Sequence, residues 1–438
     1  MLTHRHRTIL GDIPPDWDAK PLKQLITEHF AGDWGDDEGE QAVAVLRSTN
    51  FTNDGQLDFS DIARRYFPKA QADHFGLLKS DLLVERSGGG PEQPVGRIGF
   101  IDRDMPGSTV SNFVQVLRAD PEKVDASFLR WVLIELQRTG IVERVQQQST
   151  QMRNLNWRDY QRLMLPWPEI NEQHRIAAAL NLVDDAILMS RADLDATREL
   201  KRSLIDRLLT LGKSGNHHPL ETKFGAVPSH WTVKTLSEHA GSPACVKTGP
   251  FGAQLPPEAF DTEGMQFVNI TDIGEGVLAF AETLFIRDSE AKRLADYQLK
   301  PGDLIFSRVA SVGRVALIHE GSGPYMMSSN CVRLRAGTAF DPKFLCLLFL
   351  GSTFIKRQVA AMSTGGARPI VTPRFLRRLL VAKPPLDEQQ EIVQTVDAAI
   401  EVEIAKSDVV RALQKTKISL LHSLLTGRIR IPAGAIHA

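Results

Sequence analysis

The chain repeats itself, and this duplication limits its fold more than any other feature of the sequence. The stretch PEINEQHRIAAAL at 168–180 returns as PPLDEQQEIVQTV at 384–396, 216 residues later. Earlier stretches return in the same order: IPPDW (13–17) as VPSHW (227–231), LLKSDLLVER (77–86) as LKPGDLIFSR (299–308), and DASFL (125–129) as DPKFL (341–345). Several matches in one order along 438 residues predict two copies of one structural unit, each about half of the chain.

Each copy ends in a long stretch with the pattern of a coiled coil. Apolar residues recur there at alternating spacings of four and three: Ile176, Leu180, Val183, Ile187, Leu194, Leu204, Leu208 and Leu211 in the first copy, and Ile392, Val396, Ala399, Val410, Leu413, Leu420 and Leu424 in the second. This spacing over ~36 residues predicts helices that pair along one seam. A long amphipathic surface helix is the alternative. Asn171 and Asp387 are the expected N-caps.

The first part of each copy alternates short β-type stretches with Gly- and Pro-rich turns and includes one apolar stretch typical of a buried helix, FLRWVLIEL (128–136) or FLCLLFL (344–350). We therefore expect an α/β fold class: two globular α/β domains in a tandem pseudo-twofold repeat, joined by two long helices. Parallel helices would bring both domains to one end, so we expect an antiparallel coiled coil. The predicted boundaries are 1–168 (first domain), 169–212 (first helix), 213–225 (linker), 226–384 (second domain) and 385–438 (second helix and tail).

Composition and motifs indicate a binding protein. Hydrophobic residues make up 42% and charged residues 24%, as in an ordinary globular protein, and the three cysteines have no metal-site spacing. The N-terminus lacks a signal-peptide pattern, so we expect a cytoplasmic protein. The phosphate-loop-like LGKSG fails because Arg207 stands where that motif needs its first glycine. No dinucleotide, zinc-protease or calcium-loop motif is found, and we expect no catalytic residue, metal or cofactor.

Charge is locally concentrated although the net charge is only −1. Residues 351–383 contain seven Lys or Arg residues and no Asp or Glu. Such a patch suits phosphate groups, although a solvated helix face would have the same composition.

Several stretches resemble the specificity subunit of type I restriction–modification systems (HsdS-like): ERSGGGPEQPVGR (85–97), TGPFGAQL (248–255), GDLIFSR (302–308) and STGGARPIVTPRFL (363–376). The resemblance implies two target-recognition domains that read an asymmetric bipartite DNA target for phage defence. It implies double-stranded DNA and two methyltransferase subunits as partners and, for restriction, two motor–nuclease subunits. S-adenosylmethionine, Mg and ATP are then expected only in those partner subunits. The alternative is a non-catalytic duplicated coiled-coil scaffold that binds protein or another nucleic acid in a defence complex.

The resemblance and the chemistry of base and phosphate contacts together select candidate residues. We expect DNA contacts from Arg86, Ser87, Gly88, Gly89, Arg97 and Arg153 in the first copy, and from Arg308, Ser311, Arg314 and Arg368 in the second. We expect partner contacts from Glu172, Gln173, Glu388 and Gln389. The alternative is that the glycines close hairpins and the arginines brace the domains.

Overall fold

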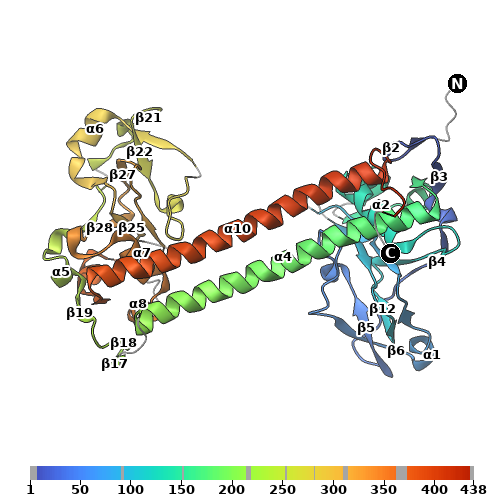
Figure 1. Cartoon of the computed structure of the whole chain (residues 1–438), viewed down its shortest axis with the longest axis horizontal. Coiled ribbons are helices and arrows are strands. Elements are labelled where there is room, and N and C mark those ends of the chain that lie inside the picture. Colours follow the sequence, from blue (N-terminus) through green and yellow to red (C-terminus); the bar gives the residue numbers. More distant parts are fainter. Residues whose placement is uncertain are drawn as a thin grey trace. The chain divides into compact units, whose positions relative to one another are not determined.

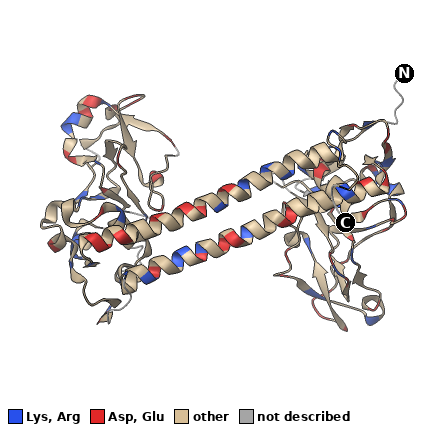
Figure 2. Ribbon diagram, in the orientation of Figure 1, with Lys and Arg blue, Asp and Glu red and all other residues tan. Residues whose placement is uncertain are grey.

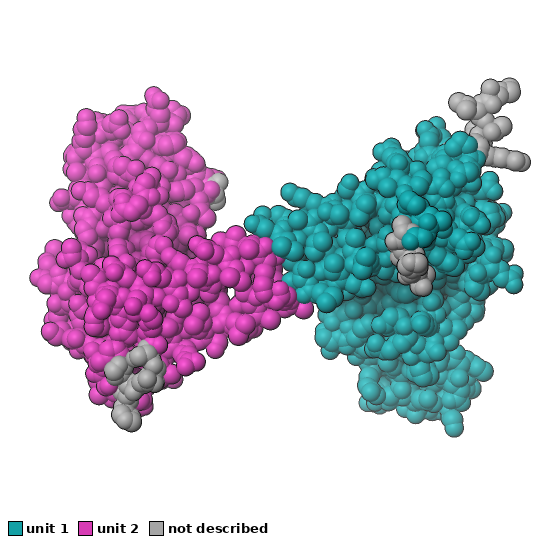
Figure 3. Space-filling model, viewed as in Figure 1, with its two compact units in different colours: residues 1–191, 408–438 teal, residues 192–407 magenta. Residues whose placement is uncertain are grey.

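The computed structural model describes residues 7–89, 93–149, 152–213, 219–251, 254–280, 282–308, 314–361 and 372–434. The chain divides into two compact units, one of Met1–Arg191 with Asp408–Ala438 and one of Ala192–Ser407 (Figure 3). Each unit contains one α/β domain and part of both long helices. The five segments predicted from the sequence do not cut the long helices, whereas the two units do. The five-segment division therefore stays a prediction.

The long helices are α4 (Ile170–Leu211) and α10 (Leu386–Leu425) (Figure 1). Within unit 1, Lys417 of α10 pairs with Asp184 of α4. Within unit 2, Lys406 Nζ lies 2.7 Å from Asp193 Oδ1, and Lys201 pairs with Glu403. Within unit 2 the partners run backward along α10 as α4 runs forward, so the predicted antiparallel pairing is confirmed.

The predicted N-caps of the long helices are wrong. Helix α4 begins at Ile170, before Asn171, and α10 begins at Leu386, before Asp387. The first turn of α4 is closed by the Glu169 carbonyl, which accepts the amides of Glu172 and Gln173. Asn171 and Asp387 are therefore inside the first turns of their helices. A carboxylate such as that of Asp387 suits the helix dipole there.

The α/β domain of unit 1 is built on a four-stranded sheet in the order β10-β8-β13-β4. Its strands are β4 (Ile26–Ala31), β8 (Leu82–Glu85), β10 (Ile98–Phe100) and β13 (Val114–Ala119). Helix α2 (Ala126–Arg138) packs on this sheet, and its N-cap Asp125 accepts the amide of Phe128. Every residue of β8 is buried, because the strand is central in its sheet.

Further strands extend this domain. Strand β3 (Asp18–Pro21) pairs with β16 (Met164–Trp167), and β5 (Gln41–Leu46) lies between β6 (Ala63–Phe67) and the parallel β12 (Ser108–Val110). A third sheet joins β14 (Gln146–Ser149), β15 (Met152–Leu155) and β9 (Ser87–Gly89). The short elements are β1 (Arg7–Thr8), β2 (Gly11–Asp12), α1 (Lys69–Ala72), β7 (Gly76–Leu77), β11 (Met105–Pro106) and α3 (Trp157–Tyr160).

Unit 2 repeats this plan. Its four-stranded sheet has the order β20-β28-β25-β26, with β20 (Val246–Thr248), β25 (Leu304–Ser307), β26 (Val315–Leu317) and β28 (Cys331–Leu334). Strand β19 (Thr232–Thr235) pairs with β29 (Leu380–Lys383), as β3 pairs with β16. Matched through the sequence repeat, the two main sheets have one strand order. The predicted duplicated α/β fold with two long helices is confirmed.

The rest of unit 2 surrounds this sheet. A five-stranded sheet in the order β21-β23-β22-β27-β24 contains β21 (Phe260–Asp261), β22 (Met265–Val268), β23 (Leu284–Ile286), β24 (Gln298–Leu299) and β27 (Tyr325–Met327). The helices are α5 (Leu236–His239), α6 (Asp288–Arg293), α7 (Pro342–Gly351), α8 (Thr353–Ala361) and α9 (Pro373–Arg378), and β17 (Pro219–Thr222) pairs with β18 (Gly225–Pro228). Among the described residues, no single helix could cross a membrane by length and hydropathy; α7 and α8 pass that test only as a pair, bent by 59°.

Candidate nucleic-acid interface

The repeated Gln of the Glu-Gln phrase ties each long helix to its own α/β domain. Gln173 Oε1 accepts the backbone amide of Asp125 at 2.9 Å, and Gln173 Nε2 donates to the Pro168 carbonyl at 2.8 Å. In unit 2, Gln389 makes the same bonds to Asp341 and Pro384, at 2.8 and 3.0 Å. The aspartates are the N-caps of α2 and α7, so each bond joins the start of a long helix to the start of a buried helix.

The repeated Glu binds a buried tryptophan. Trp17 Nε1 donates to Glu172 Oε2 at 3.0 Å, and Trp231 Nε1 donates to Glu388 Oε2 at 3.3 Å. Three repeated stretches, the tryptophan, aspartate and Glu-Gln boxes, therefore converge in space, and we call this cluster the helix anchor. It was missed in the sequence, although all three boxes were visible there.

The helix anchors account for the four residues expected to bind partners. Gln173 and Gln389 are buried, with exposures of 0% and 1%. Glu172 also binds Arg430, and Glu388 also binds His230. Because these bonds lie within the chain, a partner would have to break them to reach the side chains. Partner binding by the four residues stays a prediction.

The first-copy candidates Ser87, Gly88, Gly89 and Arg153 lie together on strands β9 and β15. Gly89 is opposite Arg153 in this sheet. Gly88 has a φ of +96°, and a Cβ there would lie 3.3 Å from the ring of Phe113. A glycine fits this backbone because L side chains rarely adopt such a φ. Arg86 adjoins β9 and is half-buried, so these five candidates form one region.

Arg97 lies beside that region, opposite Glu85 on the adjacent strand, and braces the domain. Its Nε and Nη2 donate to the two oxygens of Glu85 at 2.8 and 2.7 Å. Its Nη1 donates to the Phe51 carbonyl at 2.6 Å, and Nη2 also donates to the Ser48 carbonyl at 2.8 Å. Arg97 is only 8% exposed and Glu85 only 2%. This geometry fits the alternative in which the arginines brace the domains. DNA contact by Arg97 stays a prediction.

The matching arginine of the second copy has a different environment. Arg314 precedes β26 as Arg97 precedes β10, but its side chain is exposed. The residue that matches Glu85 is Ser307, so the carboxylate that holds Arg97 is absent at this position. Arg308 is half-buried beside β25. Ser311 and Arg368 lie outside the described residues.

The basic stretch of residues 351–383 belongs to unit 2, and Figure 2 marks the Lys and Arg positions along the ribbon. Lys356 and Arg357 on α8 and Arg374 and Arg378 on α9 are exposed. Exposed Lys and Arg groups with no nearby acid in the sequence suit phosphate contacts, which position a protein on DNA without reading its sequence.

A polar network near Arg86 was also missed in the sequence. Arg86 Nη1 donates to Gln115 Oε1 at 3.3 Å, and Gln115 Nε2 lies 3.3 Å from His29 Nδ1. The His29 ring lies 5.5 Å from that of Trp157. Arg is a side chain that reads base edges, and the buried Gln115 holds Arg86 in place beside the exposed His29. These residues come from separate strands and one short helix, so no spacing in the sequence could indicate them.

The described residues contain no group of three His, Cys, Asp or Glu side chains that could hold a metal ion. Burial raises the pKa of Cys331 to about 11 and that of Cys346 to about 12, so these thiols stay protonated. A protonated, buried thiol is a poor nucleophile and a poor metal ligand. The arrangement favours recognition through arginine, amide and backbone groups.

Comparison with known proteins points to one family. Residues 246–409 match the family described as the type I restriction modification DNA specificity domain. A protein of Methanocaldococcus jannaschii that carries the name type I restriction enzyme MjaX specificity subunit is 19% identical over 433 residues, which is 97% of this chain and 96% of that protein. The MjaVIII specificity subunit of the same organism is 20% identical over 302 residues, 65% of this chain and 67% of that protein.

Two solved structures share the fold. The S subunit of the M. genitalium type I restriction–modification system has a TM-score of 0.53 at 16% identity, covering 96% of this chain and 99% of that chain. A chain from a structural study of complex assembly and conformational transition of the type I R-M system has a TM-score of 0.60 at 14% identity, covering 95% of this chain and all of that chain. The chain therefore resembles type I specificity subunits along its whole length.

Proposed function

We propose that this chain, which resembles type I specificity subunits from end to end, is the DNA-reading subunit of a type I restriction–modification complex. The observation that carries the proposal is a duplicated domain with one strand order but different side chains at matched positions. Two domains of one fold with different surfaces suit two different half-sites. The target is then bipartite and asymmetric.

The surface chemistry supports recognition in both units. In unit 1 the region of Arg86, Gly88 and Arg153 combines a polar network with an exposed glycine on strand β9, which lets the backbone approach a ligand closely. In unit 2 the exposed Arg374 and Arg378 of α9 supply cations for phosphates. Both surfaces offer donors of the types that contact base edges and phosphate groups.

The chemistry of methylation and cleavage then belongs to partner subunits. We propose two methyltransferase subunits and, for restriction, two motor–nuclease subunits, which bind S-adenosylmethionine, Mg and ATP themselves. The chain itself is a non-catalytic protein of the cytoplasm. Its task is to choose the site at which the partners act.

The test is methyl transfer to genomic DNA with S-adenosylmethionine, followed by sequencing of the methylated positions. The reactions contain the full chain alone, the methyltransferase subunit encoded beside it alone, or both together. We expect methylation at one bipartite sequence only in the combined reaction. Methyl transfer by the chain alone, or methylation at the same sites without it, would contradict the proposal.

A further inference from the structure

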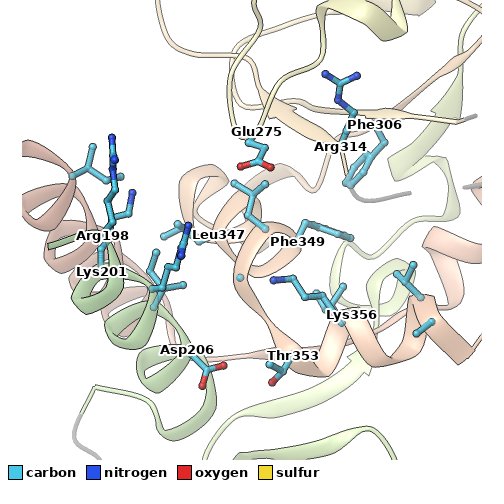
Figure 4. Close-up of a pocket in the computed structure, with 18 of the residues that line it drawn as sticks. Arg198, Lys201, Asp206, Glu275, Phe306, Arg314, Leu347, Phe349, Thr353 and Lys356 are labelled. Atoms are coloured by element: carbon cyan, nitrogen blue, oxygen red, sulfur yellow. The ribbon is translucent and has the colours of Figure 1, made fainter. Parts of the chain in front are cut away.

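Unit 2 contains an open cavity of about 1160 Å³ between α4 and the helices α7 and α8 (Figure 4). Leu347, Leu350 and Phe375 of the α/β domain and Ile205 and Ile400 of the long helices line it. All five are partly buried apolar side chains at the edge of the unit's hydrophobic core. The cavity thus leaves core-type side chains facing open space.

The matched positions of unit 1 carry different side chains. Trp131 stands where unit 2 has Leu347 and is fully buried, with Lys417 Nζ 4.8 Å from its ring centroid. Asp184 stands where unit 2 has Ile400, and it pairs with Lys417. Glu135 stands where unit 2 has Gly351 and is also fully buried. A larger aromatic ring and buried or ion-paired charged side chains therefore occupy this region in the first copy, whereas two apolar side chains and a glycine stand there in the second.

The cavity carries more positive than negative charge. Five cations line it (Arg198, Lys201, Arg202, Arg314 and Lys356), against three acids (Asp206, Glu275 and Glu403). Glu403 is held by Lys201 and Arg198, which keep its pKa below the usual value. Lys356 points from α8 into the cavity (Figure 4), and within the described part of the chain no carboxylate forms an ion pair with Lys356 or Arg314.

We propose that this cavity binds one acidic segment of a partner protein, with apolar side chains on the cavity floor and Asp or Glu side chains near Lys356 and Arg314. A phosphate backbone would satisfy the cations but would leave the apolar floor unmatched. The volume also exceeds the ~300–1,000 Å³ of ordinary small-ligand pockets. An amphipathic helix that docks its apolar face in a groove meets both requirements.

The proposal goes beyond the function proposed above. Partners that recognise features shared by the two copies would bind in pairs. Among the described residues, Trp131 and Glu135 occupy the matched positions in unit 1, so we infer that the occupant of this cavity binds once per chain. It gives the two halves of the complex different protein contacts, in addition to different DNA contacts.

The occupant is identified by photo-crosslinking from p-benzoylphenylalanine placed at position 347 of the full chain, in the complex with its partner subunits and DNA. We expect one crosslinked segment, rich in Asp or Glu and in large apolar residues. The same amino acid at position 131 is the matched control, and we expect no crosslink to a partner there. Thermal unfolding checks that both variants fold. Crosslinks to DNA alone, or none from a folded variant at position 347, would overturn the proposal.

Affinity measurements then separate the cavity from bulk charge. The probe is a synthetic peptide with the crosslinked sequence, and the protein is the full chain. We expect Lys356→Glu to weaken binding at least tenfold, whereas Arg357→Glu, on the same helix but outside the cavity, changes it less than twofold. Leu347→Trp installs the residue of the first copy and should speed dissociation at least tenfold. Equal losses in the two charge variants would show that the peptide binds through general charge.

Discussion

The pair of Arg97 and Glu85 provides the sharpest test of which arginines brace the fold. Both side chains are buried, and Arg97 uses four hydrogen bonds, two of them to the carboxylate. Glu85→Gln removes the negative charge and leaves a buried guanidinium without its counter-charge. Breaking one partner of a buried pair costs about 3–5 kcal/mol. The two backbone carbonyls that remain bound to Arg97 place the expected loss near the lower value.

Thermal unfolding with a probe in unit 1 measures this loss. At about 2–4 °C per kcal/mol for a unit of this size, a loss of about 3 kcal/mol lowers its Tm by roughly 6–12 °C. The double variant Glu85→Leu/Arg97→Met replaces the pair by apolar side chains of similar size. Such replacements are neutral or stabilising in other proteins, but Arg97→Met also removes the donor to the Phe51 and Ser48 carbonyls, so we expect the Tm to recover in part. Ser307 occupies the matching position in unit 2, and Ser307→Ala, which removes no charge, is the control.

The double variant also decides between bracing and DNA contact. If Arg97 only braces the domain, the folded double variant should direct methylation to the unchanged target with near-normal efficiency. The reasoning is refuted if the Tm recovers but the half-site changes or is lost, because Arg97 would then contact DNA. It is also refuted if Glu85→Gln leaves the Tm unchanged.

Three further outcomes follow from the structure. Gln389→Leu leaves a buried backbone amide and carbonyl without partners, so we expect chemical unfolding to show a loss of about 2–4 kcal/mol in the stability of unit 2. Gln173→Leu should cause an equal loss in unit 1, and unequal losses would show that the helix anchors differ. Burial lowers the pKa of His239, so this side chain binds more protons in the unfolded chain, and unit 2 loses stability as the pH falls below about 6.5. Tm values measured over a pH series should show a smaller loss in His239→Gln. Exchange of 13–166 for the matching domain of a relative should change one half-site only, as read by sequencing of methylated DNA.

The fold was predictable because it rests on a repeat. Each repeated stretch is weak by itself, but their common order predicts one unit built twice, and the 4-3 spacing predicts the paired helices. The N-caps were wrong because the first turn is fixed by backbone bonds to Glu169 and by tertiary bonds of Gln173, which propensity alone does not show. Tertiary contact overrode the local preference of Asn171.

The candidate site was less predictable, because exposure depends on a neighbour from another strand. Arg97 and Arg314 look equivalent in the sequence, yet one is buried and one exposed. The deciding residue is Glu85 or Ser307, which lies on the adjacent strand of the same sheet. The signal was therefore present as a difference between the copies, but reading it required the strand register. The network of Arg86, Gln115 and His29 left no comparable signal.

The two copies share the contacts that attach each domain to its long helix, and they differ at positions that shape the surface of each domain. The helix anchor uses the same atoms in both units, tryptophan indole to Glu and aspartate amide to Gln, with distances that differ by at most 0.3 Å. Two of the matched positions that differ, Trp131 against Leu347 and Glu85 against Ser307, lie at the cavity and beside an arginine that is buried in one copy and exposed in the other. A duplicated chain must keep the contacts that attach each domain to its helix, because both domains need them. It is free to change the surfaces that each domain presents, and under the function proposed here those changes would let one fold recognise two different halves of a target.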